Sequence, residues 1–428
     1  MVVTGRLAAL AAVAGVVVVV ALPSWIGVVV ATGVLVLLAA IDTVLAGNGS
    51  GLELSRPELT TVRTGRATEV ELTMVNTGTR TLRGLVWDAW PDSAGAEYRT
   101  RRIRLRPNTR TRSTTALRPT HRGDRVAGPI TVRLFGPLGL AGRQLRRDAP
   151  ARVRALPPFR SERVLAAKVR QLQQLEGRTV MNARGQGSEF DSFREYVAGD
   201  DVRAIDWRAT ARATDVLVRT WRPERNRHVL LLLDTGRTAA ARVGAGTRLD
   251  VAIEAALLLG GLAAAAGDTA DLLAFDREPR AEVRGTSGKA LQPKLMHALS
   301  GVVPTLVETD TAALIRTALQ RARRRSLIVW FTALDPALTD DTLLPTLTNR
   351  HRVLLVSPTD PDLATAATDH TTLSALYTAA TAETLRTERA LTRERLRRKG
   401  IAVVTAAPTH LPEALADEYL ELKRSGAI

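Results

Sequence analysis

The stretch GSEFDSFREYVAGDDVRAIDWRATARATDVLVRTWRPE, residues 187–224, and the apolar run HVLLLLD, residues 228–234, decide the fold of this chain. The run predicts a buried strand that ends in a carboxylate, where open α/β sheets place their sites. The longer stretch holds five of the sixteen aromatic residues of the chain, interleaved with Asp, Glu and Arg. Large apolar side chains among opposite charges predict a fixed docking or domain-packing surface.

A regular alternation of apolar strands and helices occupies residues 225–428. This order predicts a parallel sheet with helices on both faces, the doubly wound α/β class. The predicted strands are 228–233, 269–275, 326–331, 351–356 and 401–404. The predicted helices are 247–266, 291–299, 311–324, 341–349, 379–399 and 411–423.

The string YxxGDDxRxIDWxxxAR, from Tyr196 to Arg212, is the most specific motif in the chain. Together with the apolar strand that ends at Asp234, it resembles the bacterial "domain of unknown function fifty-eight" family. The resemblance implies that residues 157–224 form a motif segment leading into a von Willebrand factor A-like domain over residues 225–428.

Composition excludes several classes of protein. The chain has no cysteine, so disulfides, zinc–thiolate sites and thiol nucleophiles are excluded. The formal net charge of +17 comes from arginines spread along the chain, and the one aromatic cluster is as acidic as it is basic. Nucleic-acid surfaces need clustered basic residues, with stacking aromatics for single strands, so nucleic acid is not an expected partner.

Residues 1–46 predict a transmembrane helical hairpin. No charged residue occurs from Leu7 to Ile41, a run too long for one ordinary crossing, and Pro23 breaks it near the middle. The predicted spans are Leu7–Leu22 and Trp25–Ile41; a cleaved signal peptide is the alternative for the first. Because the flanking arginines lie outside both spans and the turn is uncharged, the positive-inside rule predicts a two-span plasma-membrane protein with cytoplasmic soluble domains. These arginines are Arg6, Arg56, Arg63 and Arg66.

Residues 52–156 predict a small antiparallel β-sandwich after a flexible glycine-rich hinge at 47–51. The runs 70–75, 103–106 and 130–134 alternate apolar with polar residues, and each precedes a turn signal. This domain shows no catalytic grouping, so it is expected to be a spacer or a protein-contact module.

The family resemblance also implies a cation site at the carboxyl edge of the sheet. A-domains hold Mg²⁺ or Mn²⁺ with an Asp-x-Ser-x-Ser loop plus a Thr and an Asp from later loops, and hard oxygen ligands suit these cations. Here Asp234, Thr238 and Thr309 match, but Gly236 lacks a hydroxyl and Ala333 replaces the later Asp. We expect a degenerate site without metal, in which Asp234 pairs with an arginine.

The motif segment allows two interpretations. Asp200 is expected to cap a helix from Asp201 to about Ala211, with Tyr196 and Trp207 packed inward. The charged residues then form either salt bridges that tie the segment to a neighbouring domain or a docking face for another protein. The residues concerned are Tyr196, Gly199, Asp200, Asp201, Arg203, Asp206, Trp207 and Arg212.

No enzyme motif is present: the histidines are scattered, no Gly-x-Ser-x-Gly elbow occurs, and residues 285–290 only faintly resemble a phosphate loop. We therefore expect a membrane-anchored scaffold without catalytic residues and without a required cofactor. The resemblance implies that it works with a MoxR-type AAA+ ATPase in assembling or remodelling envelope-associated complexes. The alternatives are a metal-dependent adhesion-type receptor with an external A-domain and a hydrolase of unfamiliar type.

Overall fold

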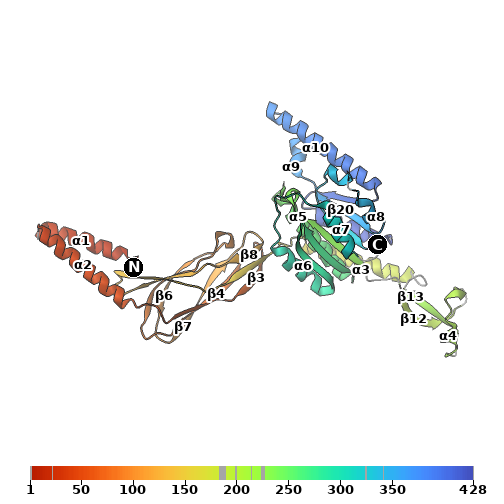
Figure 1. The fold of residues 1–428 in the computed structure, drawn as a ribbon. Helices are drawn as coiled ribbons and strands as arrows, with labels where there is room; N and C mark the ends of the chain where they lie inside the picture. The colour runs from red at the N-terminus through yellow and green to blue at the C-terminus, as the bar shows by residue number, and fades with distance from the viewer. Residues whose placement is uncertain are drawn as a thin grey trace. The chain divides into compact units, whose positions relative to one another are not determined.

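The computed structural model of the protein describes residues 2–21, 23–182, 189–197, 200–213, 215–222, 227–322, 325–340 and 342–427. The chain forms two compact units, Met1–Pro158 and Phe159–Ile428 (Figure 1). Four positions used in the sequence predictions lie outside the described residues: Leu22, Gly199, Arg324 and Asp341.

Two apolar helices, α1 (Gly5–Ala21) and α2 (Trp25–Leu45), pack on each other at the start of the first unit. The break between them falls at the predicted turn, where the Ser24 hydroxyl accepts a hydrogen bond of 3.2 Å from the N–H of Gly27 and caps α2. Among the described helices, α2 alone is long and apolar enough to cross a bilayer, by length and composition. Helix α1 is apolar but has 17 residues.

The rest of the first unit is built of β-sheets that enclose apolar cores. In the longest of the predicted runs, Val70, Leu72 and Met74 are buried and alternate with less buried residues, because successive side chains of a strand point to opposite faces. A five-stranded sheet has the order β1-β10-β9-β5-β6, and two three-stranded sheets have the orders β2-β4-β7 and β3-β11-β8. Pairing is antiparallel except between β3 and β11.

The strands of this unit have the following bounds: β1 (Val2–Val3), β2 (Leu52–Ser55), β3 (Leu59–Arg63), β4 (Thr68–Asn76), β5 (Leu82–Trp87), β6 (Thr100–Leu105), β7 (Thr109–Leu117), β8 (Gly123–Val126), β9 (Ile130–Phe135), β10 (Ala141–Arg147) and β11 (Arg152–Leu156).

Helix α2 is fastened to the β-sheets by the carboxylate of Asp42. This buried side chain accepts hydrogen bonds from the backbone N–H groups of Leu138, Leu140 and Ala141 at 2.7–2.9 Å. The following glycine-rich residues are also held, since the carbonyl of Gly49 accepts from the Arg147 guanidinium and that of Gly51 from the N–H of Thr77. Residues 47–51, predicted as a flexible hinge, are therefore hydrogen-bonded to the β-sheets through Gly49 and Gly51.

A six-stranded sheet forms the centre of the second unit, with the order β18-β17-β14-β19-β20-β21. Its strands are β14 (His228–Asp234), β17 (Thr269–Phe275), β18 (Pro279–Ser287), β19 (Leu327–Phe331), β20 (Arg352–Pro358) and β21 (Ala402–Ala406). Every residue of β14 is buried, as expected of a central strand covered on both faces.

Helices cover both faces of this sheet. Helix α5 contacts β14, β17 and β20 and packs against α3, α6 and α11. The other face forms an apolar core in which Leu230 and Trp330 meet Leu314 of α7, Leu347 of α8 and Leu396 of α10. The helices are α3 (Glu162–Asn182), α5 (Arg248–Ala265), α6 (Leu291–Ser300), α7 (Thr311–Arg321), α8 (Leu344–Thr348), α9 (Pro361–Ala366), α10 (Leu373–Arg398) and α11 (Leu411–Arg424).

The predicted strands all occur, and the sheet differs from the prediction at one edge. Strand β18 was not predicted; it pairs antiparallel with β17. Residues 285–287 belong to this strand and Gly288–Ala290 form a 3-10 turn, so the segment that faintly resembled a phosphate loop is half strand and half turn. The sheet is mixed rather than wholly parallel, and the whole chain combines an α/β unit with antiparallel sheets and an apolar amino-terminal helix pair.

Candidate functional site

Residues 189–197, 200–213 and 215–222 of the motif segment contain a two-stranded ribbon and the turns between its strands, which we call the motif module. Its strands β12 (Glu189–Glu195) and β13 (Leu217–Arg222) pair as an antiparallel ribbon. A short 3-10 turn at Val202–Ala204 and the one-turn helix α4 (Trp207–Thr210) lie between them and are tied to β13.

Asp206 is the structural centre of the motif module. Its buried carboxylate accepts from the backbone N–H groups of Arg208 and Ala209 at 2.9 and 3.0 Å and pairs with the guanidinium of Arg219. These hydrogen bonds, from Ala209 first and then from Arg219, hold the pKa of Asp206 below its ordinary value. One carboxylate thus caps α4 and ties it to strand β13.

The predicted continuous helix from Asp201 to Ala211 is wrong. The chain is extended at Ile205 and Asp206, where Ile205 bridges Val218 and the N–H of Asp206 donates to the carbonyl of Leu217. Pairing with β13 satisfies these backbone groups and interrupts the helix, because a backbone N–H that joins a sheet is lost to the helix. Asp201 caps the 3-10 turn instead, through the N–H of Arg203.

The expected inward packing of Tyr196 and Trp207 is also wrong. Trp207 is 66% exposed, and the exposed apolar side chains of the motif module also include Phe193, Tyr196, Val197 and Val202. The ion pairs found in the described module, Asp206 with Arg219 and Asp200 with Arg194, join its own residues. Arg203 and Arg212 are exposed, and Gly199 lies outside the described residues.

At the carboxyl edge of the large sheet, four hydrogen bonds converge on the carboxylate of Asp234. Oδ1 accepts from the N–H of Gly236 at 2.8 Å and from the Thr309 hydroxyl at 2.5 Å. Oδ2 accepts from Thr238 at 3.2 Å and from Thr332 at 2.8 Å. The structure thus brings together the three predicted residues, Asp234, Thr238 and Thr309.

These residues do not fit a divalent cation. An ionised carboxylate offers about four lone-pair directions, and the four donors on Asp234 occupy them. A Cβ on Gly236 would lie 2.2 Å from the Thr309 hydroxyl oxygen, so Thr309 fills the space that a serine at this position would need. Among the described residues, no group of three or more His, Asp or Glu side chains could hold a metal ion.

Among the described residues, no arginine forms the ion pair with Asp234 that we expected. Arg237 pairs with Glu308, with 2.7 Å between Nε and Oε1, and both side chains are exposed. Arg248, on the first turn of α5, donates instead to the carbonyl of Thr238. The negative charge of Asp234 still acts on Arg248 and raises the pKa of its guanidinium, against the larger lowering by burial.

Sequence reasoning missed Thr332, Asp276 and Arg248. Thr332 and Asp276 each come directly after a buried strand, β19 and β17, and that placement was the available signal. Burial raises the pKa of Asp276, but hydrogen bonds from Arg280, the N–H of Arg277 and Thr305 lower it to about 2. Asp276 thereby fastens the loop that begins at the end of β17.

The fold and the site define a protein with an α/β unit, an amino-terminal β-sheet unit and an apolar helix pair. The chain belongs to the family described as "Protein of unknown function DUF58", whose model matches residues 192–406. That range begins in strand β12 of the motif module and ends with strand β21, so the motif module and the six-stranded sheet are the family's domain.

Curated relatives match part of the chain. "Uncharacterized protein Rv1480" of Mycobacterium tuberculosis is 27% identical over 179 residues, which cover 41% of this chain and 56% of that protein. "Uncharacterized protein Mb1516" of Mycobacterium bovis matches with the same values. The chain therefore spans little more than half the length of these relatives.

Solved structures resemble the chain only weakly. PapD-like domain 7 of human CEP192 matches 25% of this chain and 86% of its own, at 16% identity and a TM-score of 0.19. The CARDB domain of the PF1109 protein from Pyrococcus furiosus matches 24% of this chain and 85% of its own, at 16% identity and a TM-score of 0.18. TM-scores this low do not define a shared fold.

Proposed function

We propose that this protein is a membrane-anchored, non-enzymatic scaffold that binds other proteins through its motif module and its α/β domain. In this proposal the α/β domain is a von Willebrand factor A-like domain whose cation site is degenerate. The partner is a MoxR-type AAA+ ATPase, which supplies the energy for assembling or remodelling envelope-associated complexes while this chain recruits it or its client.

One observation carries the proposal: the motif module presents an exposed tryptophan on a rigid base. Asp206 fixes α4 through two backbone hydrogen bonds and the pair with Arg219, and Trp207 is the next residue. A backbone that is already fixed has little conformational entropy left to lose on binding, and tryptophan is enriched in interface hot spots. This arrangement favours a docking face for another protein over a set of salt bridges that tie the segment to a neighbouring domain.

The membrane part of the proposal is a two-span anchor with the soluble domains in the cytoplasm. Helix α2 is long enough to cross, α1 is a shorter apolar helix packed on it, and Arg6, Arg63 and Arg66 flank the pair. Arg56, the fourth flanking arginine, is buried and paired with Asp88 in the folded unit.

Capture of the ATPase by the detergent-extracted full chain tests the proposal. The immobilised protein is incubated with a purified MoxR-type ATPase and a slowly hydrolysed ATP analogue, and the bound fraction is measured. Trp207→Ala should weaken capture by about tenfold or more, as hot-spot truncations do. Trp87→Ala, which removes a 43% exposed tryptophan from β5, is the matched control and should not. Equal capture by wild type and Trp207→Ala, or none by wild type, rejects the proposal.

A labelling experiment separates this proposal from an external adhesion-type receptor. The chain has no cysteine, so Leu306→Cys, on an exposed loop, gives a single reactive thiol. A membrane-impermeant maleimide should label this thiol only after the cells are permeabilised. Labelling in intact cells would place the α/β domain outside and favour the receptor.

A further inference from the structure

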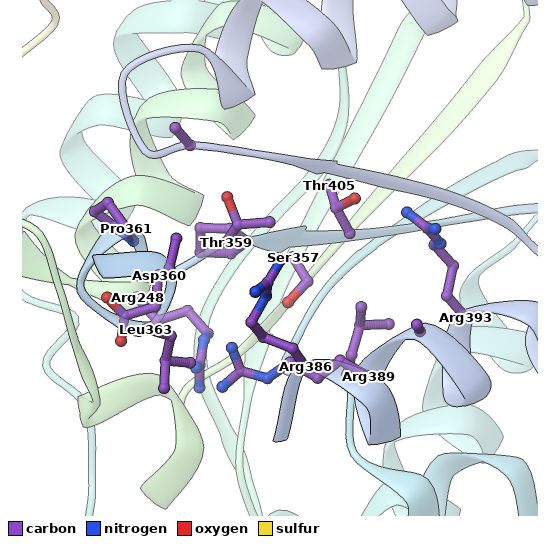
Figure 2. A pocket seen from close by; sticks show the side chains of 15 residues that line it. Arg248, Ser357, Thr359, Asp360, Pro361, Leu363, Arg386, Arg389, Arg393 and Thr405 are labelled. Carbon is purple, nitrogen blue, oxygen red and sulfur yellow. The ribbon is translucent and has the colours of Figure 1, made fainter. Parts of the chain in front are cut away.

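A cavity of about 510 Å³ opens at the carboxyl ends of strands β20 and β21, beside helix α10 (Figure 2). Four arginines line it, Arg248 from α5 and Arg386, Arg389 and Arg393 from α10, against a single carboxylate, Asp360. The three arginines of α10 are spaced i, i+3 and i+7, which places them on one face of the helix. The cavity is thus strongly positive and lies at the edge where α/β sheets bind ligands.

Arg248 is the buried residue of this set. It is 9% exposed, and its Nε has no hydrogen-bond partner among the described residues. A buried guanidinium N–H without an acceptor costs free energy, so an arginine in this state is suited to an acceptor that arrives from outside. Figure 2 shows Arg248 and Arg389 pointing into the same part of the cavity.

The charges around Arg248 are not balanced. Burial lowers its pKa, the positive charge of Arg389 lowers it further, and Asp234 and Asp360 oppose these effects. Asp360 also accepts the N–H of Asp362 at 3.1 Å. Arg389 and Arg393 form no ion pair with the described residues, whereas Arg386 pairs with the exposed Glu383 at 2.9 Å.

We propose that this cavity binds a small molecule that carries one or more phosphate groups. Four guanidinium groups face the carboxylate of Asp360, and Arg386 is paired with Glu383, so about two positive charges remain uncompensated, more than a single carboxylate ligand neutralises. A phosphate group carries up to two negative charges, and arginine binds its oxygens bidentately. The hydroxyls of Ser357, Thr359 and Thr405 add hydrogen-bonding groups to the wall.

The size of the cavity argues for more than bare phosphate. Its volume lies within the roughly 300–1,000 Å³ typical of small-molecule sites. Leu334, Pro358 and Leu363 give it an apolar wall, which suits a non-ionic part of the ligand. This inference stands apart from the proposed partnership with an ATPase, because neither Trp207 nor the motif module lines the cavity.

Calorimetric titration of the detergent-purified full chain with pyrophosphate and with ADP tests the inference. We expect binding of at least one probe with submillimolar affinity, weakened about tenfold or more by Arg389→Gln and by Arg393→Gln. Arg397→Gln changes an exposed arginine of the same helix outside the cavity and should leave the affinity within about twofold. Arg248→Gln tests the buried donor, and thermal unfolding shows that each variant is folded.

Three outcomes reject the inference. The first is a folded wild type that binds neither probe with a dissociation constant below about 10 mM, which corresponds to about 3 kcal/mol of binding free energy. The second is binding that the Arg389 and Arg393 variants leave unchanged. The third is a hexaglutamate peptide that binds in an arginine-dependent way while both phosphate probes fail, which would identify the cavity as a site for acidic protein segments.

Discussion

The hydroxyl oxygen of Thr332 lies 2.8 Å from Oδ2 of Asp234. This hydrogen bond joins the carboxyl ends of the neighbouring strands β14 and β19, which are far apart in the sequence. With Thr238 and Thr309 it makes three hydroxyl groups around one carboxylate. Hydroxyl donors stabilise the negative charge of Asp234.

Removing one of these hydroxyls should destabilise the α/β unit. Thr332→Val keeps the side-chain shape but deletes the donor to a buried carboxylate, so the free energy of unfolding should fall by about 1–3 kcal/mol. Denaturant unfolding of the detergent-purified chain measures it. Thr332→Ser keeps the hydroxyl and should lose less; a valine variant as stable as wild type would show that the bond contributes nothing.

Magnesium should not bind at Asp234. Four donors are already on the carboxylate, and the described residues contain no group of three or more His, Asp or Glu side chains that could hold a metal ion. This leaves no place for a cation that prefers several oxygen ligands. Isothermal titration of EDTA-treated protein with MgCl₂ should show no heat of binding in the millimolar range. Binding that Asp234→Ala abolishes would contradict this and would restore the adhesion-type interpretation.

Asp42 should be essential for fastening α2 to the β-sheets. Asp42→Ala leaves two buried and one partly buried backbone N–H groups without an acceptor, which should lower the free energy of unfolding of the first unit by about 3 kcal/mol. Asp42→Asn keeps one carbonyl acceptor and should have a smaller effect. Limited proteolysis at residues 136–141 and thermal unfolding report the difference, and an unchanged Ala variant would refute it.

The Asp276 carboxylate should make stability depend on pH. Its folded-state pKa of about 2 lies below the ordinary value of 3.8, so its ionised form stabilises the fold above about pH 4. That contribution should disappear as the pH falls from about 4 to about 2. Wild type should exceed Asp276→Asn by about 1–2 kcal/mol near pH 6, allowing for solvent screening, and this excess should shrink toward pH 2. A difference that stays constant with pH would contradict the assignment.

The regular elements of the fold could be predicted from local patterns. The mostly apolar run at 269–275 became β17 with the same ends, because a strand covered on both faces is mostly apolar. The alternation at residues 70–75 likewise became β4, which is buried on one face. The motif region was harder, because the N–H of Asp206 donates to Leu217 of β13 and not to a helical carbonyl, and local helix signals do not reveal that strand.

The candidate sites depend on contacts that local patterns do not contain. Asp234, Thr238 and Thr309 could be grouped because a family resemblance pointed to them, whereas Thr332 needed the pairing of β14 with β19. The spacing of Arg386, Arg389 and Arg393 is visible in the sequence, but only the fold places Arg248 across from them. Charge clusters of this kind arise when distant elements meet at one sheet edge.

The turn between β9 and β10 holds both outer ends of the apolar helix pair. Thr4 binds the carbonyl of Gly139 at 2.7 Å just before α1, and Asp42 binds the same turn near the end of α2. The same turn therefore fixes the residues just before α1 and those near the end of α2. In a bilayer that thins or thickens, a change in the tilt of the helix pair would move this turn and, with it, the ends of strands β9 and β10.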